Sequence, residues 1–399
     1  MKLQSNATFW VASCAFVLVF MTSGTPISLF NLYREENGLT NADLGVVSLA
    51  YFISAAVALL MFGRLSNYIG RKPMALIAIG CCALSCVLLM LMTDVTLLFA
   101  ARLLQGFACG VATSSIGAYA VDAGEHQPKW LVAAVASTSP MVGIPLGAIS
   151  SGALVTWAPY PKITIFALVL TLLLVCLTLL FNCRETINRQ PGALASLRPG
   201  LHLPTGKTFI FVATAGVVIS TWSAGGFYQA FGPSIVAEQL AMDSAIVAAI
   251  AFSSIMGLTP FGSYLSGRLS PRRAVQSGMA LFCVAVMSIT LALQQCGLVM
   301  FIVASLSVGI AQGLASTACI KLLLQDEPQH YRAGLLSTVY IISYSGAVLP
   351  AFGASIAANW FSVFTVWCGY AVLGIGAAVI ALMATVLARR ARQAAVVGS

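Results

Sequence analysis

Arg102 lies well inside a long apolar stretch of this 399-residue chain, where no other charged side chain accompanies it. Ionised side chains are costly inside a bilayer and are therefore functional candidates. A guanidinium in such a place can bind an anionic group or take part in proton coupling. It can also extend outward and bond backbone carbonyls of the first predicted helix. Gln105 lies one turn deeper and is a polar partner for Arg102 in either role.

Further polar and aromatic side chains occur in the middle of other apolar stretches. With Arg102 and Gln105 they form a predicted binding set: Thr22, Tyr51, Trp222, Tyr228, Gln229, Gln312, Tyr340 and Tyr344. The alternative role is helix–helix packing, in which hydroxyl residues are also enriched. Asp and Glu are missing from the middle of these stretches. The set therefore suits a neutral or weakly anionic amphipathic molecule better than a multivalent cation.

The histidines and cysteines predict neither a metal site nor a cofactor. His126, His202 and His330 lie in predicted loops, and most of the 11 Cys lie inside apolar stretches, where they act as small apolar residues. Their spacing matches no known metal motif. A catalytic cluster and a sizeable domain outside the membrane are also lacking, which disfavours a membrane enzyme or a non-transporting receptor.

The elements that hold the polar residues are predicted membrane helices. Hydrophobic residues make up 59 % of the chain and charged residues 8 %, whereas soluble domains carry about 25 % charged residues. A bilayer core of about 30 Å needs about 20 apolar residues per helix. Twelve stretches meet this requirement, at 8–31, 43–63, 74–93, 96–121, 130–156, 162–183, 208–232, 243–266, 274–294, 297–322, 333–358 and 362–388.

The positive charges predict how the helices are oriented. Lys and Arg collect in cytoplasmic loops of membrane proteins. All of these residues other than Arg34, Arg102 and Lys162 fall on one side of the predicted membrane. Both termini are therefore expected in the cytoplasm. Because the charges are scattered over short loops, the net charge of +9 does not indicate a nucleic-acid partner.

The chain contains an internal repeat. Gly63-Arg64-Leu65-Ser66 recurs as Gly267-Arg268-Leu269-Ser270, and each copy ends an apolar stretch and precedes a basic turn. Glycines, alanines and hydroxyls of 106–114 match 309–317 at one constant offset, and the counterpart of Arg102 is the neutral Ser305. The repeat predicts two homologous six-helix bundles. Their expected bounds are 1–183 and 208–399, joined by an irregular cytoplasmic linker at 184–207.

Several motifs resemble the major facilitator superfamily. Residues 63–73 resemble its loop signature between helices 2 and 3, and Arg102-Leu103-Leu104-Gln105-Gly106 resembles its helix 4 motif. Gly143-Ile144-Pro145-Leu146-Gly147 is similar to a degenerate antiporter motif, and Arg184-Glu185-Thr186 resembles the common ending of helix 6. The resemblance implies an all-α membrane protein with twelve transmembrane helices in two pseudo-symmetric bundles.

The resemblance also implies alternating access, in which two halves expose a central site first to one side of the membrane and then to the other. Helices 1, 4, 7 and 10 line the cleft in this family. Residues expected to act in coupling or gating are Gly63, Arg64, Asn67, Gly70, Arg71, Arg102, Asp122, Gly143, Pro145, Gly147, Arg268 and Arg272. Asp122 is expected to pair with a loop arginine such as Arg71.

The predicted function is secondary active transport of a small amphipathic drug or metabolite. The antiporter-like motif favours export in exchange for protons. Import or facilitated passage of a small nutrient is the alternative, because the acid that many proton-coupled exporters carry in helix 1 is absent here. The expected partners are the substrate, protons and the lipid bilayer. The expected setting is a monomer in a bacterial inner membrane.

Asn67 departs from the family pattern, which has Asp at this position of the loop signature. In the family that carboxylate lies near the start of helix 11 and helps to hold the outward-facing state. An anion at a helix N-terminus gains about 0.3–1 kcal/mol from the dipole, whereas Asn brings no charge. We predict that Asn67→Asp shifts the protein toward the outward-facing state, measured by labelling from either side. An unchanged ratio of inward to outward accessibility would count against this idea.

Overall fold

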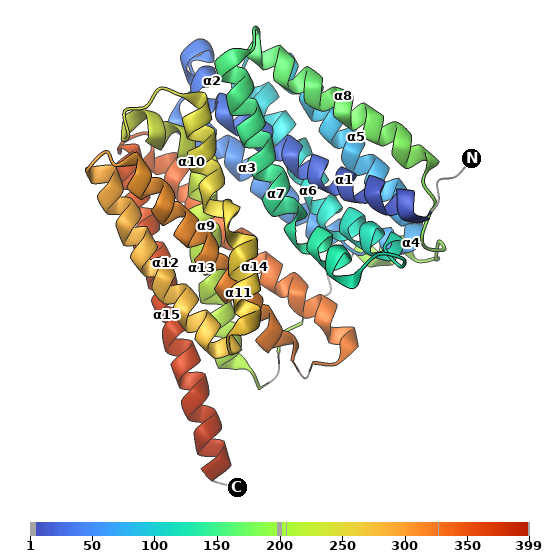
Figure 1. Ribbon diagram of the computed structural model, residues 1–399, viewed down its shortest axis with the longest axis vertical. Helices are drawn as coiled ribbons and strands as arrows, with labels where there is room; N and C mark the ends of the chain where they lie inside the picture. The colour runs from blue at the N-terminus through green and yellow to red at the C-terminus, as the bar shows by residue number, and fades with distance from the viewer. Residues whose placement is uncertain (1–4, 198–201, 205, 326, 398–399) are drawn as a thin grey trace. The chain divides into compact units, whose positions relative to one another are not determined.

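The computed structural model describes residues 5–197, 202–204, 206–325 and 327–397. In these residues every regular element is helical (Figure 1), and 12 helical segments are long and apolar enough to cross a membrane. The predicted all-α class and the number of spans are confirmed. A membrane interior supplies no water, so each span pairs its backbone groups within its own helix.

The elements of the first half are α1 (Ser5–Gly24), the 3-10 helix η1 (Thr25–Leu29), α2 (Phe30–Asn37), α3 (Asn41–Phe62), α4 (Ser66–Ile69), α5 (Arg71–Met90), α6 (Val95–Ala123), α7 (Lys129–Trp157) and α8 (Pro161–Asn182). They are followed by the 3-10 helix η2 (Ala193–Leu197), α9 (Thr208–Glu238), α10 (Ala245–Gly257), α11 (Thr259–Arg268), α12 (Pro271–Gln294), α13 (Leu298–Leu324), α14 (Gln329–Ala357) and α15 (Val363–Val397). Figure 1 shows them in this order by colour.

Several spans differ from the bounds expected from the sequence. The seventh, expected at 208–232, continues to Glu238, and the last, expected at 362–388, belongs to a helix that continues to Val397.

Two other spans contain a proline where the helix becomes irregular. The first, expected at 8–31, continues through η1 and α2 to Asn37. Pro26 lies in η1 and has no backbone N–H to donate. The chain there forms a 3-10 helix, which is wound more tightly than an α-helix. The eighth, expected at 243–266, is divided into α10 and α11 beside Pro260, which has no N–H for the carbonyl four residues earlier.

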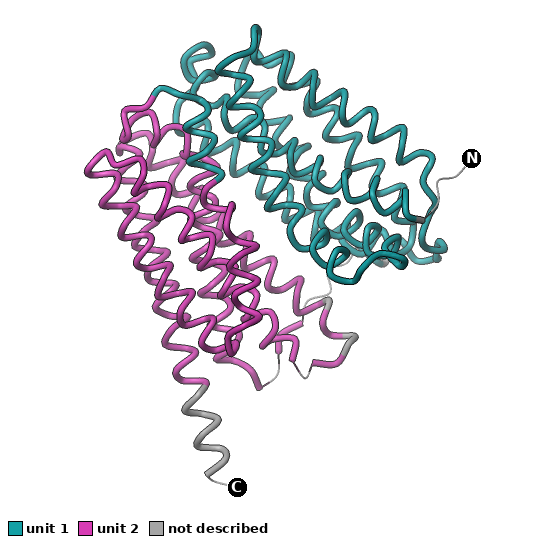
Figure 2. The backbone as a smooth tube through the Cα atoms, in the orientation of Figure 1, with its two compact units in different colours: residues 1–199, 243–253 teal, residues 200–242, 254–399 magenta. Residues whose placement is uncertain are grey.

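The chain forms two compact units (Figure 2). The first comprises residues 1–199 and 243–253, and the second comprises residues 200–242 and 254–399. Helices α1 to α8 thus belong to the first unit, and α9 and α11 to α15 belong to the second. Helix α10 begins in the first unit and ends in the second. The chain first passes between the units inside the predicted linker at 184–207.

Helix α6 is held at its N-terminus and along one side. The carboxylate of Asp94 accepts the backbone N–H groups of Leu97 at 3.2 Å and Thr96 at 2.8 Å. These hydrogen bonds lower the pKa of the Asp94 carboxyl. On one side of α6, a Cβ at Gly106 would lie 2.2 Å from the carbonyl oxygen of Tyr51. Glycine therefore lets α3 approach closely enough to place Tyr51 beside α6.

Helices α1 and α7 approach each other through the glycines of the antiporter-like motif. A Cβ at Gly143 would lie 2.5 Å from the carbonyl oxygen of Val17, and one at Gly147 would lie 2.0 Å from that of Met21. A real side chain cannot occupy either position without moving backbone. The two glycines thus set the distance between the helices, as small residues do in membrane bundles.

We predict that Gly147→Ala lowers the thermal stability of the purified protein. The added methyl group must displace α1, and overpacking of this kind costs about 1–3 kcal/mol. Gly80→Ala is the matched control, because a Cβ at Gly80 meets nothing within 4 Å. That control should be neutral or more stable, since Ala favours a helix by about 0.5–1 kcal/mol over Gly. Equal melting temperatures for the two variants would contradict the close contact.

Candidate functional site

Arg102 is completely buried in the first unit and bonds to α1. Its relative exposure is 0 %. One terminal nitrogen, Nη1, donates to the carbonyl oxygen of Ser23 at 2.8 Å and to Oε1 of Gln105 at 2.9 Å. The bond to an α1 carbonyl was one of the two expected roles. However, the side chain does not extend outward to reach it, and it stays inside the bundle.

Two further contacts complete the surroundings of Arg102. The Gln105 amide donates through Nε2 to the carbonyl oxygen of Thr22 at 3.1 Å. The ring of Tyr51 lies with its centroid 4.4 Å from Cζ of Arg102, and a desolvated cation–π contact of this kind contributes about 2 kcal/mol. We call Thr22, Ser23, Tyr51, Arg102 and Gln105 the Arg102 network. It brings four of the predicted binding residues together, and Thr22 and Ser23 take part through their backbone carbonyls.

The Arg102 network leaves part of the guanidinium unsatisfied. Nε and Nη2 of Arg102 are buried and have no hydrogen-bond partner among the described residues. Within the same residues, no carboxylate pairs with Arg102, and ion pairs such as Arg71–Asp122 and Lys162–Glu36 lie near helix ends. A buried charge without an opposite charge is strongly unfavourable. The two free N–H groups can donate to the oxygen atoms of an anionic group, whose geometry a guanidinium matches.

The second unit has a neutral arrangement at the equivalent place. Ser305 meets the hydroxyl of Tyr228 at 2.5 Å and donates to the carbonyl oxygen of Phe301 at 2.7 Å. The Tyr228 ring stacks on Phe301 with centroids 5.6 Å apart. Tyr228 thus joins α9 to α13, as Arg102 joins α6 to α1. Its hydroxyl is engaged in packing the unit, which was the alternative to a binding role.

The remaining predicted binding residues are spread over the second unit. Trp222 and Tyr344 are half-buried and form an edge-to-face pair with centroids 4.9 Å apart. Trp222 also packs against a buried cluster that includes Val218 and Val339. The other three are Gln229, which is buried, and Gln312 and Tyr340, which are half-buried. The structure brings Trp222 and Tyr344 into direct contact.

The loop signature forms a polar cluster at the other end of α6. Arg71 donates through Nε to Oδ2 of Asp122 at 3.0 Å and through Nη1 to Oγ of Ser66 at 2.7 Å. The expected pairing of Asp122 with Arg71 is thus present. Both side chains are partly exposed, and ion pairs of this type contribute about 0–1 kcal/mol. The cluster therefore contributes little to the stability of the fold, and its main effect is to orient the turn before α5.

Glu185 caps α5 from a distant part of the chain. Its two carboxylate oxygens accept the backbone N–H groups of Arg71 at 2.9 Å and Lys72 at 3.1 Å. A carboxylate at this position also interacts favourably with the helix dipole. Gly70, with φ of 116°, turns the chain so that these N–H groups face Glu185, and a Cβ there would lie 2.4 Å from Oε2. We call this arrangement the Glu185 cap.

The other predicted gating residues occupy varied positions. Arg64, Asn67 and Arg268 are exposed, Gly63 ends α3, Arg272 is half-buried, and Pro145 is half-buried inside α7. Arg268 donates to the hydroxyl of Tyr264 one turn earlier. Nothing in these positions tests a gating role, which stays a prediction.

A family model for the Major Facilitator Superfamily matches residues 11–351. The chain belongs to the Major Facilitator Superfamily. Membership, together with the 12 spans, makes the chain a multi-pass integral membrane protein. The resemblance inferred from the sequence motifs is confirmed.

Individual proteins support the same assignment. Uncharacterized transporters of Rickettsia felis and Rickettsia bellii are 29 % and 27 % identical to the chain over 173 residues, 42 % of this chain. The alignments span 41 % of each relative, so less than half of those proteins is matched. A solved bacterial homolog to the human lysosomal transporter Spinster, in an inward-facing and occupied conformation, has a TM-score of 0.69 at 14 % identity. It covers 98 % of both chains and shows that they share a fold.

Two contributions to the site of this superfamily member were not assigned from its sequence. Ser23 contributes a backbone carbonyl to Arg102, and side-chain type carries no signal for such a role. Glu185 was recognised only as part of the motif that ends helix 6. Its capping role depends on the approach of the 184–186 segment to α5. The motif was the available signal, because it marks an acid directly after a span.

We predict that Glu185→Ala destabilises this Major Facilitator Superfamily protein by about 1–2 kcal/mol, the typical cost of removing a helix cap. Two backbone donors at the start of α5 then lose their acceptor. The measurement is thermal unfolding of the purified protein, with the exposed Glu125 replaced in Glu125→Ala as the control. A Glu185→Ala protein as stable as the control would show that water replaces the cap without loss.

Proposed function

We propose that this superfamily member exports a small amphipathic drug or metabolite by alternating access, in exchange for protons. The observation that carries the proposal is the Arg102 network, with a buried cation that has two unoccupied donors and no carboxylate beside it. Such a group binds an anionic partner strongly, because the surrounding medium does not screen the charge.

Proton exchange follows from competition for that anionic partner. An acid group binds Arg102 in its deprotonated form, so a proton and Arg102 compete for the same oxygen atoms. The middle of each described span lacks Asp and Glu, so the acid belongs to the substrate or to a peripheral carboxylate. Binding of such a substrate would then release a proton, and protonation would release the substrate.

The substrate class follows from the side chains assigned to binding. Tyr51 and Gln105 contact Arg102, the Thr22 carbonyl accepts from Gln105, and Trp222 with Tyr344 offers an aromatic surface. Aromatic rings and hydroxyls suit a molecule with an apolar body and a polar or weakly anionic end. The absence of buried carboxylates near these residues in the described chain disfavours a multivalent cation. The remaining members of the proposed binding set are Tyr228, Gln229, Gln312 and Tyr340.

The proposed gate is the polar cluster of Arg71, Asp122 and Ser66 with the Glu185 cap. By the positive-inside rule this cluster lies on the cytoplasmic side, and both termini lie there too. The setting is a bacterial inner membrane, in line with the bacterial sources of the relatives. We propose a monomer.

Import or facilitated passage of a nutrient remains the second candidate. It is favoured by the sequence of α1, which contains no acid between Ser5 and Gly24. The same Arg102 network would then bind a substrate whose movement is not linked to protons. The pH dependence of transport separates the two functions.

The first experiment is reconstitution of the purified protein into liposomes with an imposed pH gradient. Compounds that raise its melting temperature are added, and both compound uptake and internal pH are followed. The proposal predicts accumulation that depends on the gradient, with proton movement in the opposite direction. Arg102→Ala should fold but lose this coupled transport by roughly 10- to 100-fold, the value of hydrogen bonds to a charged group.

Two matched variants show whether the loss of transport in Arg102→Ala is specific to the guanidinium. Arg102→Lys keeps the charge but loses the planar set of donors, so intermediate activity is expected. Lys129→Ala removes an exposed positive charge and should retain full activity. Full coupled transport by Arg102→Ala would overturn the role of Arg102. Uptake that ignores both the pH gradient and the membrane potential would establish facilitated passage instead.

A further inference from the structure

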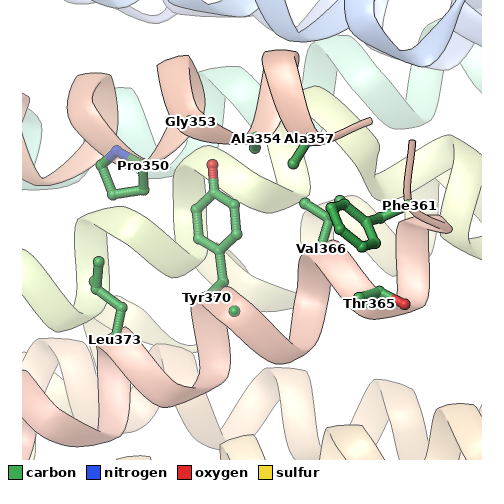
Figure 3. A pocket seen from close by; sticks show the side chains of 10 residues that line it. Pro350, Gly353, Ala354, Ala357, Phe361, Thr365, Val366, Tyr370 and Leu373 are labelled. Carbon is green, nitrogen blue, oxygen red and sulfur yellow. The ribbon is translucent and has the colours of Figure 1, made fainter. Parts of the chain in front are cut away.

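A cavity of about 240 Å³ lies inside the second unit, between α14 and α15 (Figure 3). Pro350 and Gly353 line it from α14, and Gly369, Tyr370 and Leu373 line it from α15. None of the residues assigned to substrate binding or gating takes part. Its lining is apolar apart from two hydroxyls, which distinguishes it from the Arg102 network.

Glycine is the reason that the cavity exists. A Cβ at Gly353 or at Gly369 would meet nothing within 4 Å. In contrast to Gly147, these two glycines do not serve close contact between helices, and larger side chains would fit in their place. Small residues face each other across α14 and α15, so the helices leave a space that their own side chains do not fill.

Tyr370 presents an unused polar group to this space. The side chain is only 6 % exposed, and its ring is held against Phe227 with centroids 5.2 Å apart. Its hydroxyl points from α15 toward α14 (Figure 3) and has no hydrogen-bond partner in the described chain. The other hydroxyl of the lining, that of Thr365, already bonds to Ser362 at 3.0 Å. A buried donor without an acceptor is unfavourable, so Tyr370 is expected to have a partner that occupies the cavity.

The position of the cavity indicates where that partner comes from. Neighbouring apolar side chains on both helices are exposed on the second unit, including Leu349, Phe352 and Val372, and exposed apolar side chains of a membrane span match the hydrocarbon of the bilayer. Exposed Trp360 lies between α14 and α15, where aromatic residues mark the membrane interface. Along α15 the lining of the cavity runs from Thr365 to Leu373, about 12 Å at 1.5 Å per residue.

We propose that the cavity holds one acyl chain of a bilayer lipid and that the Tyr370 hydroxyl donates to the ester carbonyl of that lipid. The elongated apolar space suits a hydrocarbon chain, and the single free donor suits a single acceptor. Tyr370 lies about 10 Å along α15 from Val363, and helical side chains tilt back toward the N-terminus. The hydroxyl is thus close to the inner boundary of the interface, which is about 5–7 Å deep on each side.

The test uses the full-length protein in vesicles of phosphatidylethanolamine and phosphatidylglycerol. A trace of phosphatidylcholine with a photoreactive diazirine in one acyl chain is added, and labelled peptides are identified by mass spectrometry after irradiation. Adducts are expected to concentrate on the residues that line the cavity. Tyr370→Phe keeps the ring and should lower this labelling roughly three- to tenfold, as for loss of one hydrogen bond. Gly369→Leu should abolish it by filling the space.

Matched controls separate the reduced labelling of Tyr370→Phe and Gly369→Leu from general changes at the surface of the protein. Val372→Leu alters an exposed position on the same helix, and Tyr160→Phe removes an exposed phenol elsewhere. Both should label as the unchanged protein does. Equal labelling of Gly369→Leu and Val372→Leu would overturn the proposal, because the label would then report only the outer surface.

An ether-linked form of the same probe tests the hydrogen bond itself, since it has no ester carbonyl. The unchanged protein should label less with the ether than with the ester probe, whereas Tyr370→Phe should not distinguish them. Equal labelling of the unchanged protein by both probes would overturn the role given to Tyr370. Loss of labelling on addition of a transported compound, but not of excess unlabelled lipid, would assign the cavity to substrate instead.

Discussion

The interior of a bilayer provides neither water nor counter-ions, and this constraint governs how polar groups inside the membrane spans are satisfied. Arg102 shows the constraint most directly. Its charge is removed from water, so part of the guanidinium is satisfied by a carbonyl of α1 and by Gln105, and the ring of Tyr51 covers one face. The remaining donors are unsatisfied. A group with this balance is stable only within a surrounding bundle.

The two units meet the same constraint with different chemistry. Where the first has Arg102, the second has Ser305, and a hydrogen bond between the hydroxyls of Ser305 and Tyr228 takes the place of those donated by a charged guanidinium. Both pairs join the first and fourth spans of their unit. The two copies of the internal repeat thus share the position of an interhelical contact, but only the first copy has a charged side chain there.

Glycine has two opposite uses in the bundle. At Gly106 and Gly147 the missing side chain allows backbones to approach so closely that even a methyl group would collide. At Gly353 and Gly369 it leaves a space between α14 and α15. Sequence composition does not distinguish these uses, because both kinds lie in apolar helices of similar character. The distance to the neighbouring helix separates them.

The sequence by itself determined the helical class, the 12 spans and the superfamily, because span length, apolar composition and loop motifs are local properties of the chain. It also identified Arg102, Gln105, Thr22 and Tyr51, since polar side chains are conspicuous inside apolar stretches. Only the tertiary structure decided that these four meet, and that Glu185 caps α5. Such contacts join segments far apart in the chain, and their geometry depends on how closely neighbouring helices pack.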